Sequence, residues 1–241
     1  MIPKVIHYCW FGKKSLPSLA LKCLNSWKTY LPDYQLMLWN EKNFEINSVT
    51  YVKEAYLSGK YAFVTDYVRL YVLYHFGGIY MDTDVEVVKN MDDLLILPGF
   101  SGFESDKDVP TGIMACEKYN EWAKEQLKYY ENKHFLKGDG SLDLTSNVEI
   151  ISGNMAAFGF KLDNSYQVYK NCMHFFPKDY FCPKSRTGII NLTNNSYCIH
   201  HFEGSWLPTH LKLKNILFRN ILGPQITDFL VHKKRKLIRH L

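Results

Sequence analysis

Short β-type runs alternate with helix-type stretches along most of the chain. Apolar residues bounded by turn residues predict strands, and apolar residues recurring every three or four positions predict helices. The strands expected on this basis are Lys4–Phe11, Tyr34–Trp39, Phe100–Glu104, Ile113–Cys116 and Tyr197–Phe202. The helices expected are Pro17–Thr29, Tyr51–Ser58, Tyr61–Phe76 and Glu117–Asn132. This alternation predicts an α/β fold.

The stretch from Tyr61 to Phe76 carries the first candidate chemistry. It contains no proline or glycine and is apolar on almost every side, which predicts a buried helix. Its only full charges, Asp66 and Arg69, lie three residues apart and therefore share a helix face. An ion pair on a helix surface is the simple interpretation, but charges on a buried helix require a partner or a ligand.

Two aspartates follow this helix. Gly77-Gly78 is expected to end the helix, and Ile79-Tyr80-Met81 then predicts a short strand. If the strand continues, alternation places Asp82, Asp84 and Glu86 on one face. Carboxylates gathered in this way favour a hard divalent cation, Mg²⁺ or Mn²⁺, which retains coordination sites for substrate phosphates.

The same Asp-x-Asp spacing recurs at Asp106 and Asp108, in a polar segment before Pro110 that predicts a solvated loop. A bare Asp-x-Asp is therefore weak evidence. The first pair is distinguished by the helix, the double glycine and the apolar strand that precede it.

Composition and charge favour one catalytic domain with a basic extension. The chain has 241 residues, 46% of them hydrophobic, which suffices for a single core, expected over residues 1–206. Residues 207–241 hold eight Lys or Arg against one acid, Asp228, so this segment accounts for the net charge of +5. Its interleaved apolar residues predict an amphipathic helix that either contacts a membrane surface or packs on the domain. Nucleic-acid binding is not expected, because no reader motif accompanies the charge.

The N-terminus resembles neither a signal peptide nor a membrane anchor. Six cysteines show no metal-ligand spacing, so zinc is not expected and free thiols in a reducing cytosol are the simplest interpretation. The cysteines are Cys9, Cys23, Cys116, Cys172, Cys182 and Cys198. The expected location is the cytoplasm, with peripheral contact with the inner face of the membrane left open.

Three separated motifs together resemble glycosyltransferase family 32. They are IPKVIHYCWFG near the N-terminus, AFVTDYVRLYVLYHFGGIYMDTDVEVVKNMDDLL in the middle, and HHFEGSW near residue 200. The family includes bacterial capsular polysaccharide and lipopolysaccharide glycosyltransferases and yeast-type initiating mannosyltransferases. The resemblance implies a GT-A-type nucleotide-binding fold with a mixed central sheet flanked by helices. It assigns no motif between about residues 99 and 196.

The resemblance also implies a donor site. By position, Trp10 matches the aromatic residue that stacks on the nucleobase. Asp66 and Arg69 match the pair that contacts the sugar and phosphate portions, and Ser205 and Trp206 match residues that contact the diphosphate.

A metal site is implied in the same way. Asp82 matches the carboxylate that faces ribose and the metal, and Asp84 matches the direct ligand, so both are catalytic candidates together with Asp66 and Arg69. One histidine of His200-His201 would complete the set. Adjacent strand residues face opposite ways, and the family pattern favours His201.

The activity implied is metal-dependent, retaining transfer of a hexose from a nucleotide sugar, with UDP-galactose or UDP-glucose favoured. The acceptor is a glycan or lipid-linked oligosaccharide of surface polysaccharide biosynthesis. Two alternatives remain open: a non-catalytic nucleotide-sugar or glycan-binding module, and an Asp-x-Asp phosphohydrolase.

Overall fold

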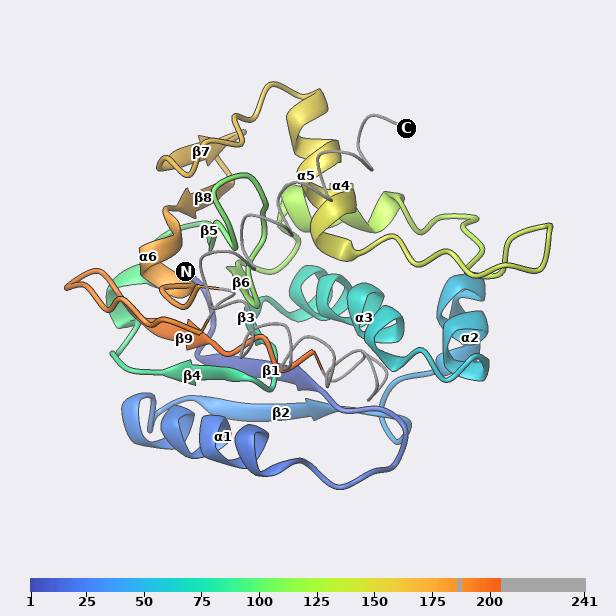
Figure 1. The fold of residues 1–241 in the computed structure, drawn as a ribbon, viewed down its shortest axis with the longest axis horizontal. Coiled ribbons are helices and arrows are strands. Elements are labelled where there is room, and N and C mark those ends of the chain that lie inside the picture. The colour runs from blue at the N-terminus through green and yellow to red at the C-terminus, as the bar shows by residue number, and fades with distance from the viewer. Residues whose placement is uncertain (186–187, 205–241) are drawn as a thin grey trace, which may run out of the picture.

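The central sheet has seven strands in the order β2-β1-β3-β6-β5-β8-β7 (Figure 1). The computed structural model describes residues 1–185 and 188–204. The strands are β1 (Val5–Cys9), β2 (Gln35–Trp39), β3 (Gly78–Met81), β5 (Gly99–Gly102), β6 (Ile113–Cys116), β7 (Gln167–Tyr169) and β8 (Met173–Phe176). β1 is parallel to β2 and β3, whereas β6 is antiparallel to β3 and β5. The sheet is therefore mixed, as the resemblance implied.

Helices cover the sheet, and a small second sheet lies at its side (Figure 1). The helices are α1 (Ser18–Tyr30), α2 (Thr50–Leu57), α3 (Tyr61–Phe76), α4 (Glu121–Lys128), α5 (Asn147–Ala157) and α6 (Lys178–Phe181). β4 (Val85–Val87) pairs antiparallel with β9 (Cys198–His200) in the second sheet. Among the described residues, no helix is both long enough and apolar enough to span a bilayer. The α/β class and the mixed central sheet flanked by helices are confirmed.

Two apolar cores lie on opposite faces of the sheet. Ile79 and Met81 of β3 pack in the core shared with α1 and β4, whereas Tyr80, between them, packs in the core shared with α2, α3 and α4. β6 alternates in the same way. Because both faces are buried, these central strands are apolar at nearly every position, unlike the half-buried strands of an open sheet.

The predicted order is confirmed for the elements up to β6, and α3 has the predicted bounds. One later prediction was wrong in its bounds, and several later elements were missed. The expected helix from Glu117 is shorter, because the Asn120 side chain accepts a hydrogen bond from the Trp122 N–H and caps the helix there. The helix α5 and the strands β7 and β8 were not predicted.

The double glycine sets the close approach of α3, β1 and β3. Gly77 and Gly78 have φ values of +68° and +100°, which side chains rarely adopt. A Cβ on Gly78 would lie 2.7 Å from the Val5 carbonyl oxygen. His7 of β1 lies 2.9 Å through Nε2 from the Gly77 carbonyl oxygen, and its Nδ1 accepts from Trp39 Nε1 at 3.0 Å. His7 is thus a buried structural residue whose Nε2 carries the proton.

We expect Gly78→Ala to lower the free energy of unfolding by more than about 3 kcal/mol, since a strained φ and a backbone clash add. Gly59→Ala is the matched control: Gly59 has a φ of +66°, but a Cβ at this position would have no other atom within 4 Å. It should cost only about 1–2 kcal/mol. Urea unfolding of both variants checks the difference, and equal losses would contradict the close-approach argument.

Candidate metal and donor site

Asp66 and Arg69 form the buried pair that the helix pattern predicted. They lie on one face of α3, and Arg69 Nη2 is 3.2 Å from Asp66 Oδ1. The Arg69 side chain is only 11% exposed and also donates through Nε to the Thr65 carbonyl oxygen at 3.3 Å. Burial raises the pKa of Asp66 to about 6, although Arg69 opposes the shift. This carboxyl therefore takes up a proton at a higher pH than an ordinary aspartate does.

Asp82 lies directly beyond the end of β3. Its Oδ1 is 3.2 Å from Arg69 Nη2 and accepts a hydrogen bond from the Tyr80 hydroxyl at 2.8 Å. The Arg69 guanidinium also lies over the Tyr80 ring, 4.9 Å from its centroid. One guanidinium nitrogen thus bridges Asp66 and Asp82, which come from a helix and a strand end. The carboxylates more than offset the effect of burial, and the pKa of Arg69 lies above its usual value.

The strand does not continue through the aspartates as predicted. The Val85 N–H donates to the Asp82 carbonyl oxygen at 3.0 Å, so residues 82–85 form a turn, and the chain enters the second sheet as β4. Asp84 Oδ2 accepts from the Glu203 N–H at 2.8 Å, and Asp84 Oδ1 lies 3.4 Å from His200 Nε2. Burial raises the pKa of Asp84, but His200 outweighs it and the net shift is downward.

Asp82, Asp84 and His200 form the one group in the described part of the chain that could hold a metal ion. Their candidate ligand atoms all lie within 4.8 Å of one another. Gly112 leaves the space open: a Cβ there would lie 3.1 Å from both Asp82 Oδ2 and His200 Nε2. Two carboxylates and one imidazole suit Mn²⁺ or Mg²⁺, so the residues fit the predicted cofactor class.

The structure places His200 beside the two aspartates, whereas the sequence favoured His201. His201 Nε2 lies 2.7 Å from Glu86 Oε2, which also accepts from Lys22 Nζ at 2.8 Å. In the register of β4 and β9, His201 is the residue opposite Asp84, and the His201 N–H donates to the Asp84 carbonyl oxygen at 2.9 Å. If β4 began before Asp84, the two side chains would therefore lie on the same face. The turn at residues 82–85 redirects the Asp84 side chain toward His200 instead. Glu86, predicted to lie with the aspartates, is likewise turned away.

The other predicted donor residues are Trp10, Ser205 and Trp206. Trp10 follows β1 and is partly exposed, with Nε1 donating to the Lys14 carbonyl oxygen at 2.6 Å. Ser205 and Trp206 lie outside the described residues, as does the basic extension 207–241. Their assigned roles stay predictions.

The second Asp-x-Asp is not a simple solvated loop. Asp108 is buried, and one of its carboxylate oxygens accepts from the Ser105 hydroxyl at 2.6 Å. Asp106 is exposed and pairs with Lys178 at 2.6 Å. Neither carboxylate belongs to the metal-type group, so context separated the two motifs correctly although the solvated-loop prediction was wrong for Asp108.

Sequence reasoning missed the contribution of the region between residues 99 and 196. Gly112 faces the metal-type group, and Asn147, the first residue of α5, donates through Nδ2 to the Asp66 carbonyl oxygen at 3.3 Å. A signal for α5 was present in Ser146-Asn147-Val148-Glu149, a capping-box sequence. Ser146 indeed caps the helix by accepting from the Glu149 N–H.

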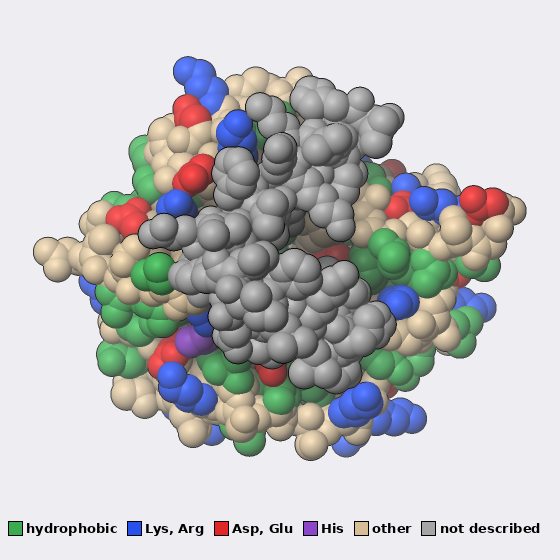
Figure 2. All heavy atoms as spheres, in the orientation of Figure 1, with side chains coloured by type: hydrophobic (Ala, Val, Ile, Leu, Met, Phe, Trp, Pro, Cys, Tyr) green, Lys and Arg blue, Asp and Glu red, His purple; other side chains and the backbone are tan. Residues whose placement is uncertain are grey.

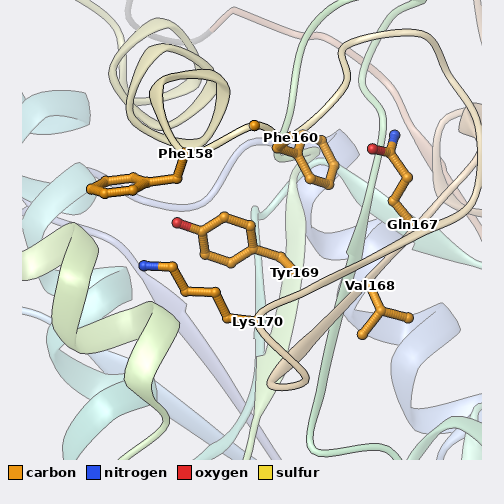
Figure 3. A pocket seen from close by; sticks show the side chains of 7 residues that line it. Phe158, Phe160, Gln167, Val168, Tyr169 and Lys170 are labelled. Carbon is orange, nitrogen blue, oxygen red and sulfur yellow. The ribbon is translucent and has the colours of Figure 1, made fainter.

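A separate small hollow lies away from this site, at the edge of the sheet (Figure 3). It has a volume of about 230 Å³ and is lined by residues 158–160 and 167–170. Lys170 Nζ lies 4.3 Å from the centroid of the exposed Phe158 ring. None of the predicted site residues lines it. On the face drawn in Figure 2, charges of both signs are interspersed among the described residues.

Comparison with known families gives one match in the functional region. Residues 17–100 match the family described as "Glycosyltransferase sugar-binding region containing DXD motif". The match spans α1 to the start of β5 and includes Asp66, Arg69, Asp82 and Asp84.

Two yeast relatives are similar over part of their length. An inositol phosphoceramide mannosyltransferase of Schizosaccharomyces pombe is 30% identical over 48% of this chain and 34% of its own. A mannosyl phosphorylinositol ceramide synthase of Saccharomyces cerevisiae is 31% identical over 56% of this chain and 38% of its own. The aligned part thus spans just over a third of the length of these yeast relatives.

A viral relative matches nearly end to end. An uncharacterised glycosyltransferase of Acanthamoeba polyphaga mimivirus is 27% identical over 91% of this chain and 89% of its own. Among solved structures, the PaToxG glycosyltransferase superimposes with a TM-score of 0.48 and 18% identity, over 66% of this chain and 70% of its own.

We expect Arg69→Met to lower the free energy of unfolding by about 3–5 kcal/mol, because Asp66 and Asp82 lose the cation between them. The loss should be larger at pH 8 than at pH 5. Asp66 has a raised pKa in the folded state, so its carboxyl favours folding when protonated, and that stability is lost as pH rises through about 6.

Arg69→Lys is the control for this prediction, since it keeps the cation and should recover most of the stability. Urea unfolding at both pH values gives the comparison. A Met variant as stable as the Lys variant at pH 8 would show that the charge bridge contributes nothing.

Proposed function

We propose that this glycosyltransferase family 32-like chain is a metal-dependent, retaining glycosyltransferase that moves a hexose from a nucleotide sugar to a lipid-linked or glycan acceptor. One observation carries the proposal. Asp82 belongs both to the metal-type group with Asp84 and His200 and to the buried bridge with Asp66 and Arg69. A site for a hard cation and a site of buried polar groups are thereby joined through one carboxylate.

Asp82, Asp84 and His200 are the residues that would hold Mn²⁺ or Mg²⁺. Such an ion, when bound, offsets the negative charge of the departing nucleoside diphosphate. His200 binds metal only when Nε2 is deprotonated; burial lowers its pKa, but Asp84 outweighs this and raises the pKa well above its usual range. Metal and proton therefore compete for this nitrogen.

Arg69 acts mainly by position in this proposal. Its side chain is committed to Asp66, Asp82 and the Tyr80 ring, which fixes the two carboxylates relative to each other. Asp66 is then available as an acceptor for a sugar hydroxyl, because a carboxylate offers more lone pairs than this one guanidinium nitrogen uses. Retention of anomeric configuration is part of the proposal and follows the family resemblance, with same-face displacement as the simplest route.

The donor and acceptor are proposed by class. UDP-galactose and UDP-glucose were favoured from sequence, and the named yeast relatives are mannosyltransferases, which adds mannose donors. Those relatives act on inositol phosphoceramide by name, so a glycolipid acceptor is favoured here over a capsular glycan. A cytoplasmic location with peripheral membrane contact remains part of the proposal.

The decisive measurement is hydrolysis of a panel of nucleotide sugars with and without Mn²⁺, beside calorimetry with UDP and GDP. Metal-dependent nucleotide binding with slow sugar release supports the transferase. Nucleotide binding without any turnover indicates a binding module, and release of phosphate from simple esters without a nucleotide indicates a phosphohydrolase.

We expect Asp84→Asn to lower metal-dependent turnover at least about 100-fold while the fold is retained, because the ligand loses its charge. Asp106→Asn is the matched control, since it alters the other Asp-x-Asp at an exposed ion pair. It should leave turnover unchanged. Full activity of Asp84→Asn would refute the site assignment.

The two histidines give a second test of the site. His200→Ala should raise the Mn²⁺ concentration needed for half-maximal turnover about 10- to 100-fold, as loss of a ligand or its close support does. His201→Ala removes side-chain contacts with Glu86 and Lys184, which lie outside the metal-type group, and should change that concentration less than about threefold. The reverse order of effects would return the ligand role to His201.

A further inference from the structure

Four buried side-chain atoms in the described part of the chain have no hydrogen-bond partner. They are Thr111 Oγ1, Tyr130 OH, Asn147 Oδ1 and His200 Nδ1. Buried polar atoms are nearly always paired in folded proteins, so each exception requires a reason. These four belong to residues at or next to the candidate site: His200 is in the metal-type group, Thr111 precedes Gly112, and Asn147 contacts Asp66. Burial and the nearby Asp66 charge raise the pKa of Tyr130.

Asn147 is the best placed of the four to meet a ligand. It is 3% exposed and begins α5, a helix of 11 residues whose N-terminus lies against Asp66. Its backbone N–H and its side-chain amide both lower the pKa of Asp66, partly offsetting burial and the Asp82 charge. The residue is thus held against the Asp66 end of the charge bridge.

The orientation of the Asn147 amide follows from its partner. A carbonyl oxygen only accepts hydrogen bonds, so the atom facing the Asp66 carbonyl oxygen at 3.3 Å must be the amide nitrogen. Oδ1 is then the free end. An amide oxygen is an acceptor, so its missing partner must be a donor, such as a hydroxyl. The diphosphate oxygens of a nucleotide sugar carry no hydrogen at neutral pH and cannot fill this role.

We infer that Asn147 is a specificity-determining residue for the transferred sugar: its Oδ1 accepts a hydrogen bond from one sugar hydroxyl beside Asp66. The inference rests on the proposed glycosyl transfer and adds a residue that distinguishes one transferred sugar from another. Within the donor, hydroxyl groups occur on the ribose and on the transferred sugar, and affinity for the nucleoside diphosphate alone separates the two in the test below. A site built to bond a hydroxyl discriminates strongly against an analogue that lacks it, because the buried acceptor is left unpaired.

The test compares Asn147→Ala with the wild type, using intact full-length protein, Mn²⁺ and the donor that gives the highest turnover. The affinity of the variant for that nucleotide sugar, or its kcat/KM with that donor, should be at least tenfold lower than in the wild type. Affinity for the matching nucleoside diphosphate alone should change less than threefold. Asn154→Ala is the matched control, because Asn154 lies on the same helix and contacts Gln126 instead; it should change neither.

Deoxy-sugar donors identify the hydrogen bond itself. The wild type should lose at least tenfold in kcat/KM when one particular hydroxyl is absent, and Asn147→Ala should be nearly indifferent to that same deletion. If Asn147 had only a structural role, Asn147→Ala would lower kcat/KM by the same factor for every donor. The ratio of kcat/KM between the complete and the deoxy donor would then be the same in the variant and the wild type. If Asn147→Ala proves unfolded by circular dichroism, Asn147→Ser replaces it, since serine retains a helix-start residue but shortens the reach.

Two failures are distinguishable. If Asn147→Ala weakens the nucleoside diphosphate as much as the nucleotide sugar, or loses the same factor with every deoxy donor, the inference on Asn147 is overturned while glycosyl transfer stands. If the wild type neither binds nor hydrolyses any nucleotide sugar, the proposed function itself fails.

Discussion

The site depends on one guanidinium placed between two carboxylates. Arg69 Nη2 lies 3.2 Å from Asp66 and 3.2 Å from Asp82, and all three groups are mostly removed from water. Two carboxylates facing each other in such surroundings would be costly to ionise without a cation between them. Because Asp66 comes from α3 and Asp82 from the end of β3, this contact also fixes the helix against the strand. The chemistry of the site and the packing of the domain are therefore coupled.

The turn after Asp82 is the second determinant. A continuous strand would have kept the Asp84 side chain on the face predicted by alternation. The turn instead moves the chain from the central sheet into the pairing of β4 with β9, which brings His200 to the aspartates from more than a hundred residues away. Gly112, directly before β6, leaves the space between them free of side chain. Three segments that share no sequence pattern thus meet at one point.

The region between residues 99 and 196 completes the site, although no family motif marks it. Its helix α5 starts at Asn147, against Asp66, and Gly112 faces the metal-type group. Buried polar atoms left unpaired reduce stability, so their gathering around one site indicates a surface shaped for a ligand rather than for packing alone. Functional sites commonly contain such unfavourable local features, and the stability of the surrounding fold offsets their cost.

The sequence by itself determined the elements whose patterns are local. The buried helix of residues 61–76, the glycine turn and the reach between Asp66 and Arg69 all follow from periodicity and spacing within a few turns. Only the tertiary structure decided which histidine joins the aspartates. The side chains of His200 and His201 point to opposite faces of the strand, as adjacent residues do. Which of the two faces the aspartates depends on the register between β4 and β9 and on the turn that precedes β4. Neither is encoded near His200, and the bond between Asn147 and Asp66 likewise joins residues that only the completed fold makes neighbours.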